Sequence, residues 1–217
     1  MSASPPQDTG WLLALHSSGE GLGVGLVPTG LDPETSGQTR VELFPTGRDL
    51  SNRLLACVEE MLPADRWSAL RRLAVATGPG GFTSTRLTVV FARTLAQQLN
   101  LPLDGISSFR LIARRLQQTS QAPSQPFWLV QDLPRRGTVA GRYGPDAASP
   151  GGIAELDAPR LLPGDLPLEG PCLPATAQPG EDVRQLLAFS RDAGIMGAPA
   201  DWQAVLPLYP TSPVRQI

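Results

Sequence analysis

The sequence predicts an α/β fold, in which strands form mixed sheets that helices cover. In the first 45 residues, apolar residues alternate with glycine or polar residues, as in "GLGVGLVP" at 21–28, which is typical of strands. From about residue 48 the apolar residues recur every three or four positions, which is typical of helices, and short apolar runs return between the helical segments. A meander of strands followed by alternating helices and strands indicates a mixed sheet.

Each element of the first half follows from its own pattern. The predicted order is strands at 11–18, 21–28 and 39–45, a helix at 48–62, a strand at 71–77, a helix at 84–99, a strand at 103–108 and a helix at 108–118. Asp49 or Ser51 can cap the first helix, and Thr83 or Ser84 can cap the second. This order of elements is that of a ribonuclease-H-like half-domain.

The second half, residues 108–217, predicts a smaller and less regular lobe. Its recognisable elements are strands at 126–133 and 138–143, a helix at 181–194 and a short segment at 205–210. Between 144 and 180, Gly and Pro make up 14 of 37 residues, a density that cannot hold long helices. We therefore expect a short disordered tail at 1–10, an N-terminal lobe at 11–107 and a degenerate, loop-rich C-terminal lobe.

Two residue types that much enzyme chemistry requires are missing or scarce. All 18 basic residues are arginine, which excludes a phosphate-loop lysine and Schiff-base chemistry. His16 is the only histidine, which excludes a zinc site built on paired histidines. A net charge of −2 gives no long-range attraction to nucleic acid. The sequence contains no run of 18 apolar residues, which a membrane span would require. We expect no catalytic residue, metal site or cofactor.

A glycine-rich turn separates the strand at 71–77 from the helix that follows. Its residues are Gly78, Pro79, Gly80, Gly81, Phe82 and Thr83. The N-terminus of a helix offers free N–H groups and a partial positive charge, so an anion can bind there. The chain lacks the lysine and the spacing of the phosphate-binding fingerprints. A structural turn is therefore favoured over a nucleotide site, which stays the alternative.

The helix after this turn has apolar residues on two sides. Leu87, Phe91 and Leu95 are expected to face the sheet, and a second side built from small residues is expected to face outward. The helix at 48–62 is also broadly apolar. Either the two helices pack only on each other and on the sheet, or they present a partner-binding surface. The candidate interface residues are Leu55, Val58, Glu59, Thr85, Arg86, Val89, Ala92, Arg93 and Ala96.

Five segments and one motif together indicate a family. The segments are "LLALHSS" at 12–18, "LSNRLLACVEEML" at 50–62, "LAVATGPGGFTSTRLTVVFARTLAQQLNLPLDGISSFRLIA" at 73–113, "VQDLPRRGTVAGRY" at 130–143 and "VLPLYPTSP" at 205–213. The specific motif is Gly-Pro-Gly-x-Phe-Thr-x-x-Arg, which runs here from Gly78 to Arg86. In their order and spacing these segments resemble the TsaB (YeaZ) family. The resemblance implies a two-lobed actin-like ATPase (ASKHA) fold that has lost its chemistry.

The resemblance also implies a function and a set of partners. It implies a non-catalytic, cytoplasmic protein of tRNA modification that pairs through its N-terminal helices. The implied partner is a second copy or TsaD, the subunit that transfers the threonylcarbamoyl group to adenosine 37 of tRNA, and the ATPase TsaE joins that complex. The alternatives are a homodimeric scaffold without a role for TsaD, and an active ATPase or peptidase-like enzyme of the same fold.

The end of the first strand departs from the family pattern. The family usually has Asp-Thr-Ser there, whereas this chain has His16, Ser17 and Ser18. A neutral imidazole cannot replace a carboxylate as a magnesium ligand, because Mg²⁺ strongly prefers oxygen. The departure indicates a diverged member and counts against the enzyme alternative.

Overall fold

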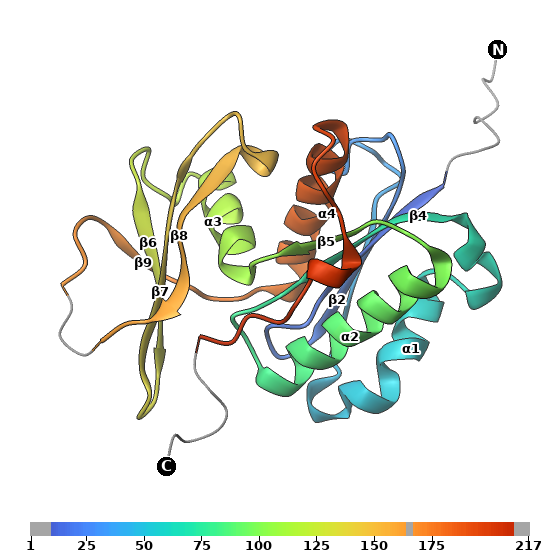
Figure 1. Ribbon diagram of the computed structural model, residues 1–217, viewed down its shortest axis with the longest axis horizontal. Helices are drawn as coiled ribbons and strands as arrows, with labels where there is room; N and C mark the ends of the chain where they lie inside the picture. The colour runs from blue at the N-terminus through green and yellow to red at the C-terminus, as the bar shows by residue number, and fades with distance from the viewer. Residues whose placement is uncertain (1–9, 164–166, 211–217) are drawn as a thin grey trace.

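The first sheet of the protein has five strands and the mixed order that the sequence predicts. The computed structural model describes residues 10–163 and 167–210, so the tail predicted at 1–10 lies, except for Gly10, outside the described residues (Figure 1). The strands are β1 (Trp11–His16), β2 (Leu22–Pro28), β3 (Arg40–Phe44), β4 (Leu70–Ala76) and β5 (Leu103–Ile106), in the order β3-β2-β1-β4-β5. The first three strands form an antiparallel meander, and β4 and β5 run parallel to β1.

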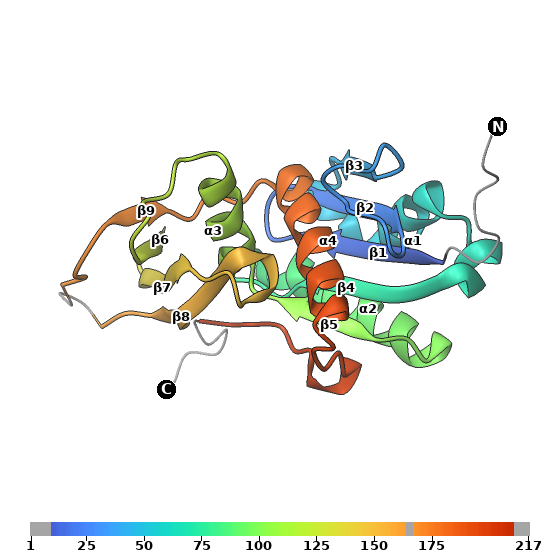
Figure 2. The same ribbon diagram turned by 90° about the horizontal axis from the view of Figure 1, so that it is seen from above.

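Helices cover both faces of this sheet. The helices α1 (Leu50–Met61) and α2 (Phe82–Leu99) lie side by side on one face, and α4 (Pro179–Ile195) lies on the other (Figures 1 and 2). Side chains of a strand alternate between faces, so Leu13 of β1 joins the core under α1 and α2, whereas Leu12 joins the core under α4. In the described part of the chain, no helix combines the length and the hydropathy that a membrane crossing requires.

The second sheet has four strands, two of which the sequence analysis missed. Its strands are β6 (Phe127–Leu133), β7 (Gly137–Pro145), β8 (Ile153–Leu161) and β9 (Cys172–Pro174), in the order β8-β7-β6-β9. The helix α3 (Ser108–Gln118) lies between this sheet and α4 (Figure 2). The missed strands β8 and β9 contain Pro159 and Pro174, and both are edge strands. Edge strands tolerate proline, because the missing N–H group removes no central ladder bond.

The predicted helix starts need two corrections. The helix α2 begins at Phe82, two residues before the prediction, and its N-cap residue is Gly81 without a side-chain cap. The Ser84 hydroxyl instead donates to the Gly81 carbonyl. Asp49 is the N-cap residue of α1, but its carboxylate accepts a hydrogen bond from the side chain of Asn52 and not from the helix backbone.

The helix α4 follows the second sheet in sequence but is anchored to the first. Arg72 of β4 holds Asp104 of β5 through two bonds, Nε to Oδ2 at 2.6 Å and Nη2 to Oδ1 at 2.8 Å. The hydroxyl of Ser190 in α4 donates to the same carboxylate. Nearer the start of α4, Arg115 of α3 pairs with Asp182 at 2.7 Å. The hydrogen bond of Ser190 thus holds α4 against the first sheet, and the ion pair of Asp182 holds it against α3.

Candidate functional site

The glycine turn is packed tightly against the end of the first strand. Gly78 has a φ of +99°, a conformation that favours glycine. A Cβ atom on Gly80 would lie 2.4 Å from Cβ and 2.6 Å from Cα of Ser18, so only glycine permits this approach. The glycines therefore have a packing role, because they let the turn close onto β1 before α2 begins.

Pairs of hydroxyl groups fill the space beside the turn. Ser17 and Ser18 follow the end of β1, and both are buried. The hydroxyls of Ser17 and Thr88 lie 2.7 Å apart, and those of Ser18 and Ser108 lie 2.6 Å apart. These bonds join β1 to α2 and α3 through neutral groups. The described residues contain no group of three or more His, Cys, Asp or Glu side chains that could hold a metal ion.

His16, the last residue of β1, is fully buried. The pKa of its imidazole is lowered to about 3, chiefly because of burial, and the nearby positive charge of Arg115 contributes to this lowering. The ring is therefore neutral near pH 7. Its Nδ1 atom accepts a long hydrogen bond of 3.4 Å from the Ser18 N–H, and its Nε2 atom has no hydrogen-bond partner in the structure.

The predicted orientation of the second helix was wrong. Small residues that were expected to face outward instead face the sheet and are buried, namely Thr85, Val89, Ala92 and Ala96. Three of these four belong to the core that β1 and β4 also line. Leu87 and Phe91, which were expected on the sheet, are only half-buried, whereas Leu95 is buried as expected. Small side chains let the helix lie close to the sheet, which leaves these two bulkier residues away from it.

The outward side of α2 carries no charge along its centre. Its residues recur at the spacing i, i+4, i+7 and i+11 as Thr83, Leu87, Val90 and Thr94. Val90 is 50% exposed, and the Thr94 hydroxyl is turned back onto the carbonyl of Val90 at 2.9 Å. A helix that faces only water usually carries charged residues on this side. The uncharged side is thus the unusual feature of this surface.

The neighbouring helix α1 adds to the same surface. Leu50 and Ser51 of α1 line a pocket of about 380 Å³ together with Phe82 and Leu87 of α2. Leu55, one turn after Ser51 on the same flank, is 50% exposed. We define the partner face as these exposed or half-buried residues of the two helices: Leu55, Phe82, Thr83, Leu87, Val90 and Thr94.

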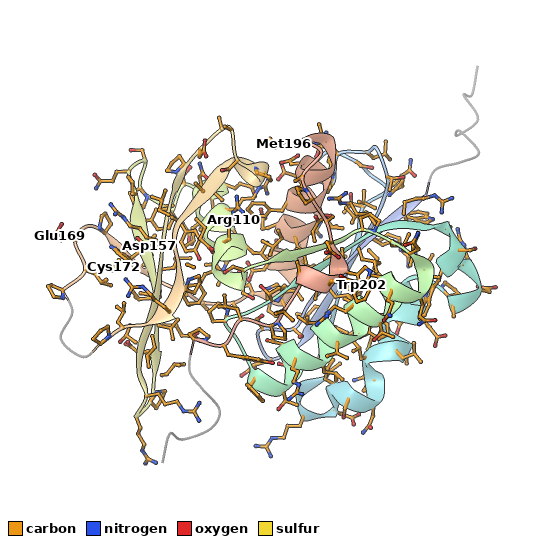
Figure 3. All side chains as sticks on the ribbon, viewed as in Figure 1. Arg110, Asp157, Glu169, Cys172, Met196 and Trp202 are labelled. Carbon is orange, nitrogen blue, oxygen red and sulfur yellow. The ribbon has the colours of Figure 1, made fainter. Side chains whose placement is uncertain are left out.

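The remaining predicted interface residues divide between surface and core. Val58 of α1 is fully buried, which corrects its place in the predicted interface, and Glu59 is half-buried. Arg86 is exposed beside the partner face, whereas Arg93 is half-buried, with its guanidinium 6.0 Å from the ring centroid of Trp202. Figure 3 places Trp202 beside α2, in the short helix η4 (Trp202–Ala204). The sequence analysis did not place Thr83, Leu87, Val90 and Thr94 together on the outward side of α2, although their uncharged helical spacing was a signal for it.

A second pocket adjoins the glycine turn on the side of the second sheet. Its volume is about 300 Å³. Pro79, Gly80 and Phe82 form its wall on the first lobe, and the β6–β7 hairpin and the C-terminal segment form the other walls. The hairpin supplies Arg136 as a charged lining residue. Phe82 therefore lines both this pocket and the pocket on the partner face.

Comparison with known proteins gives one family model and one curated relative. The model described as TsaD: tRNA N6-adenosine threonylcarbamoyltransferase matches residues 45–140. The tRNA threonylcarbamoyladenosine biosynthesis protein TsaB of Bacillus subtilis (strain 168) is 39% identical over 54 residues. This match spans 25% of the present chain and only 22% of the relative's length.

Two solved structures match over nearly the whole chain. YeaZ from Pseudomonas aeruginosa has a TM-score of 0.70 at 21% identity, and the match covers 92% of this chain and 99% of YeaZ. A crystal structure described as an uncharacterized protein with similarity to peptidase YEAZ from Pseudomonas aeruginosa has a TM-score of 0.72 at 22% identity, covering 93% of this chain and 100% of that one. The chain is therefore an α/β protein with the two-lobed fold of YeaZ and mixed sheets, as the sequence predicted.

Two kinds of match agree with the family resemblance found in the sequence. A segment of 54 residues is similar to TsaB in sequence, and nearly the whole chain is similar to YeaZ in fold. The present chain spans less than a quarter of the TsaB relative's length in the sequence match.

Proposed function

We propose that this protein is a non-catalytic subunit in tRNA threonylcarbamoyladenosine biosynthesis that binds a TsaD-type transferase through the partner face. The match to TsaB and the match of residues 45–140 to the TsaD model support the pathway. The observation that carries the proposal is the uncharged outward side of α2 beside the exposed Leu55 of α1. Apolar side chains that remain half in water on two adjacent helices are a typical feature of interaction surfaces.

The end of β1 supports a role without catalysis. A neutral, buried imidazole stands where the family resemblance leads us to expect a carboxylate, and hydroxyl pairs occupy the space beside it. Neither group supplies the negative charge that Mg²⁺ and phosphate chemistry require. In the proposed role the protein contributes binding energy and position to its partner, and a TsaE-type ATPase joins the resulting complex.

The same face serves a second copy of the chain when the transferase is absent. The partner face is small and apolar in its centre, with Arg86 at its border. Either a second copy of the chain or a transferase can cover these residues, but the two cannot bind at the same time. Self-association and binding of the transferase are therefore proposed to compete.

Substitution of Val90 tests the proposal. Val90→Arg places a charge at the centre of the partner face, and an exposed site accepts it without unfolding the monomer. In a dry interface an unpaired charge costs several kcal/mol, so we expect roughly 100-fold weaker binding or more. Light scattering measures self-association, and calorimetry with the TsaD-type protein of the same organism measures partner binding. Leu156→Arg is the matched control, because Leu156 is also apolar and 49% exposed but lies on β8.

Three outcomes would contradict the proposal in different ways. Unchanged association of the Val90→Arg variant would mean that the partner face lies elsewhere. Self-association without any binding of the transferase by the unaltered protein would favour a homodimeric scaffold. Hydrolysis of ATP by the purified chain that is lost in a Thr83→Ala variant would favour the enzyme alternative.

A further inference from the structure

The C-terminal segment of the described chain, residues 205–210, is fixed to the first lobe, and we call it the C-terminal strap. Val205 is buried, and a Cβ atom on Gly105 of β5 would lie 2.8 Å from Val205 Cγ1. Three residues later, the Leu208 N–H donates to the Thr77 carbonyl at 2.7 Å, immediately after β4. Figures 1 and 2 show this segment running from the first lobe toward the second sheet.

The strap ends in contact with the first residue of α2. The rings of Tyr209 and Phe82 have centroids 4.7 Å apart and planes inclined by 37°. Offset or inclined aromatic pairs at this separation stabilise one another beyond the area they bury. The two side chains are 38% and 40% exposed, so each ring covers part of the other and neither is enclosed by the core.

Apart from the hydrogen bond of the Ser84 hydroxyl to the Gly81 carbonyl, the start of α2 lacks the usual stabilising groups of a helix N-terminus. Gly81 provides no side-chain cap, and the first turn of α2 contains no acidic residue to complement the helix dipole. At the start of the helix, the Thr85 N–H donates a backbone hydrogen bond to the Gly81 carbonyl at 2.9 Å. The stacking of Tyr209 on Phe82 is thus an important restraint on this turn.

We propose that Tyr209 of the C-terminal strap is a positioning residue for the first turn of α2, and thereby for the N-terminal end of the partner face. Phe82 transmits the effect, because it touches Tyr209 and also lines the pocket of about 380 Å³ between α1 and α2. The proposed effect of Tyr209 on the first turn of α2 does not depend on the proposed function, whereas its effect on partner binding rests on that function.

Hydrogen exchange and binding measurements on two Tyr209 variants test the proposal. Tyr209→Ala removes the ring, and Tyr209→Phe keeps it. Loss of the stacking should raise the exchange rate of the Thr85 amide roughly two- to tenfold and weaken partner binding by a similar factor. Tyr209→Phe should restore both values. Leu206→Ala is the control within the strap, because Leu206 is 60% exposed and not in the stacked pair.

The two readouts separate the possible outcomes. Unchanged exchange at Thr85 in Tyr209→Ala overturns the proposal, and so does weaker binding with unchanged exchange, since Tyr209 would then touch the partner directly. Faster exchange that Tyr209→Phe does not reverse would assign the effect to the hydroxyl and also overturn it. If the unaltered protein binds no partner, the proposed function fails, while the exchange rates still decide whether Tyr209 positions α2.

Discussion

His16 shows how burial sets the chemistry of a single residue. Both ring nitrogens lie out of contact with solvent at the end of β1, and the charge of Arg115 opposes a second positive charge nearby. The imidazole consequently stays neutral across the physiological range. The sequence predicted that this position has no role as a magnesium ligand, but only the structure gives the depth of burial and the neighbouring arginine.

The depressed pKa of His16 predicts how stability depends on pH. Below pH 6.5 the unfolded chain binds a proton at His16 that the folded protein does not bind until about pH 3. The stability that the folded protein gains from a neutral His16 is therefore complete above pH 6.5. It is lost as the pH falls, by about 1.4 kcal/mol of the free energy of unfolding per pH unit. Between pH 6.5 and pH 5 the free energy of unfolding should fall by ~2 kcal/mol more than in a His16→Gln variant.

Urea unfolding of both proteins at several pH values provides the measurement. The comparison with His16→Gln cancels the contribution of carboxyl groups, which titrate in both proteins. Parallel pH profiles for the two proteins would show that His16 binds its proton over the same pH range in the folded and the unfolded protein, contrary to the lowered pKa.

The helix α2 shows why a periodic pattern predicts that a helix forms more reliably than it predicts which side of the helix faces the sheet. Its sequence contains two sets of residues at helical spacing, one of which includes Val89 and the other Val90. Hydrophobicity alone does not distinguish them, because both are aliphatic. The structure selects the set with small side chains for the sheet, since only this choice lets α2 approach β1 and β4 closely.

Adjacent valines should therefore respond differently to the same substitution. Val89 is fully buried, so Val89→Arg places a charge in the core and should lower the free energy of unfolding by several kcal/mol. Val90→Arg should change it by about 0.5 kcal/mol or less, as is usual at exposed sites. Thermal unfolding followed by circular dichroism compares the two variants. Equal loss of stability in both would mean that the helix faces the sheet in another orientation.

At the scale of the whole molecule, α4 connects the two lobes. It follows the second sheet along the chain, yet it covers one face of the first sheet (Figure 2). The helix α3 contacts both lobes through Arg110, which Figure 3 labels. The guanidinium of Arg110 donates a hydrogen bond to the carbonyl of Ile153 in β8. The same guanidinium lies 4.9 Å from the ring centroid of Phe189 in α4. The two lobes therefore share their central helices.

The ionic contact of Arg72 and Asp104 should be important for this arrangement. The Asp104 side chain is 5% exposed and accepts hydrogen bonds from Arg72 and Ser190. Asp104→Ala leaves the Arg72 guanidinium without this carboxylate and should destabilise the fold by roughly 2 to 4 kcal/mol. Chemical denaturation measures the loss, and Asp65→Ala at an exposed site is the control. A loss as small as that of the control would mean that the Asp104 carboxylate contributes little to holding α4 on the first sheet.

The sequence by itself determined the elements of the first lobe, the fold class and the family resemblance, because periodicity and the glycine motif are local properties of the chain. Of the turn predicted at residues 78–83, Gly78–Gly81 form a turn that packs closely on Ser18 at Gly80, whereas Phe82 and Thr83 belong to α2. Tertiary structure decided which side of α2 is exposed, the place of α4, the edge strands β8 and β9 and the stacking of Tyr209 on Phe82. These features depend on contacts between residues far apart in sequence, and such contacts leave little trace in any local pattern.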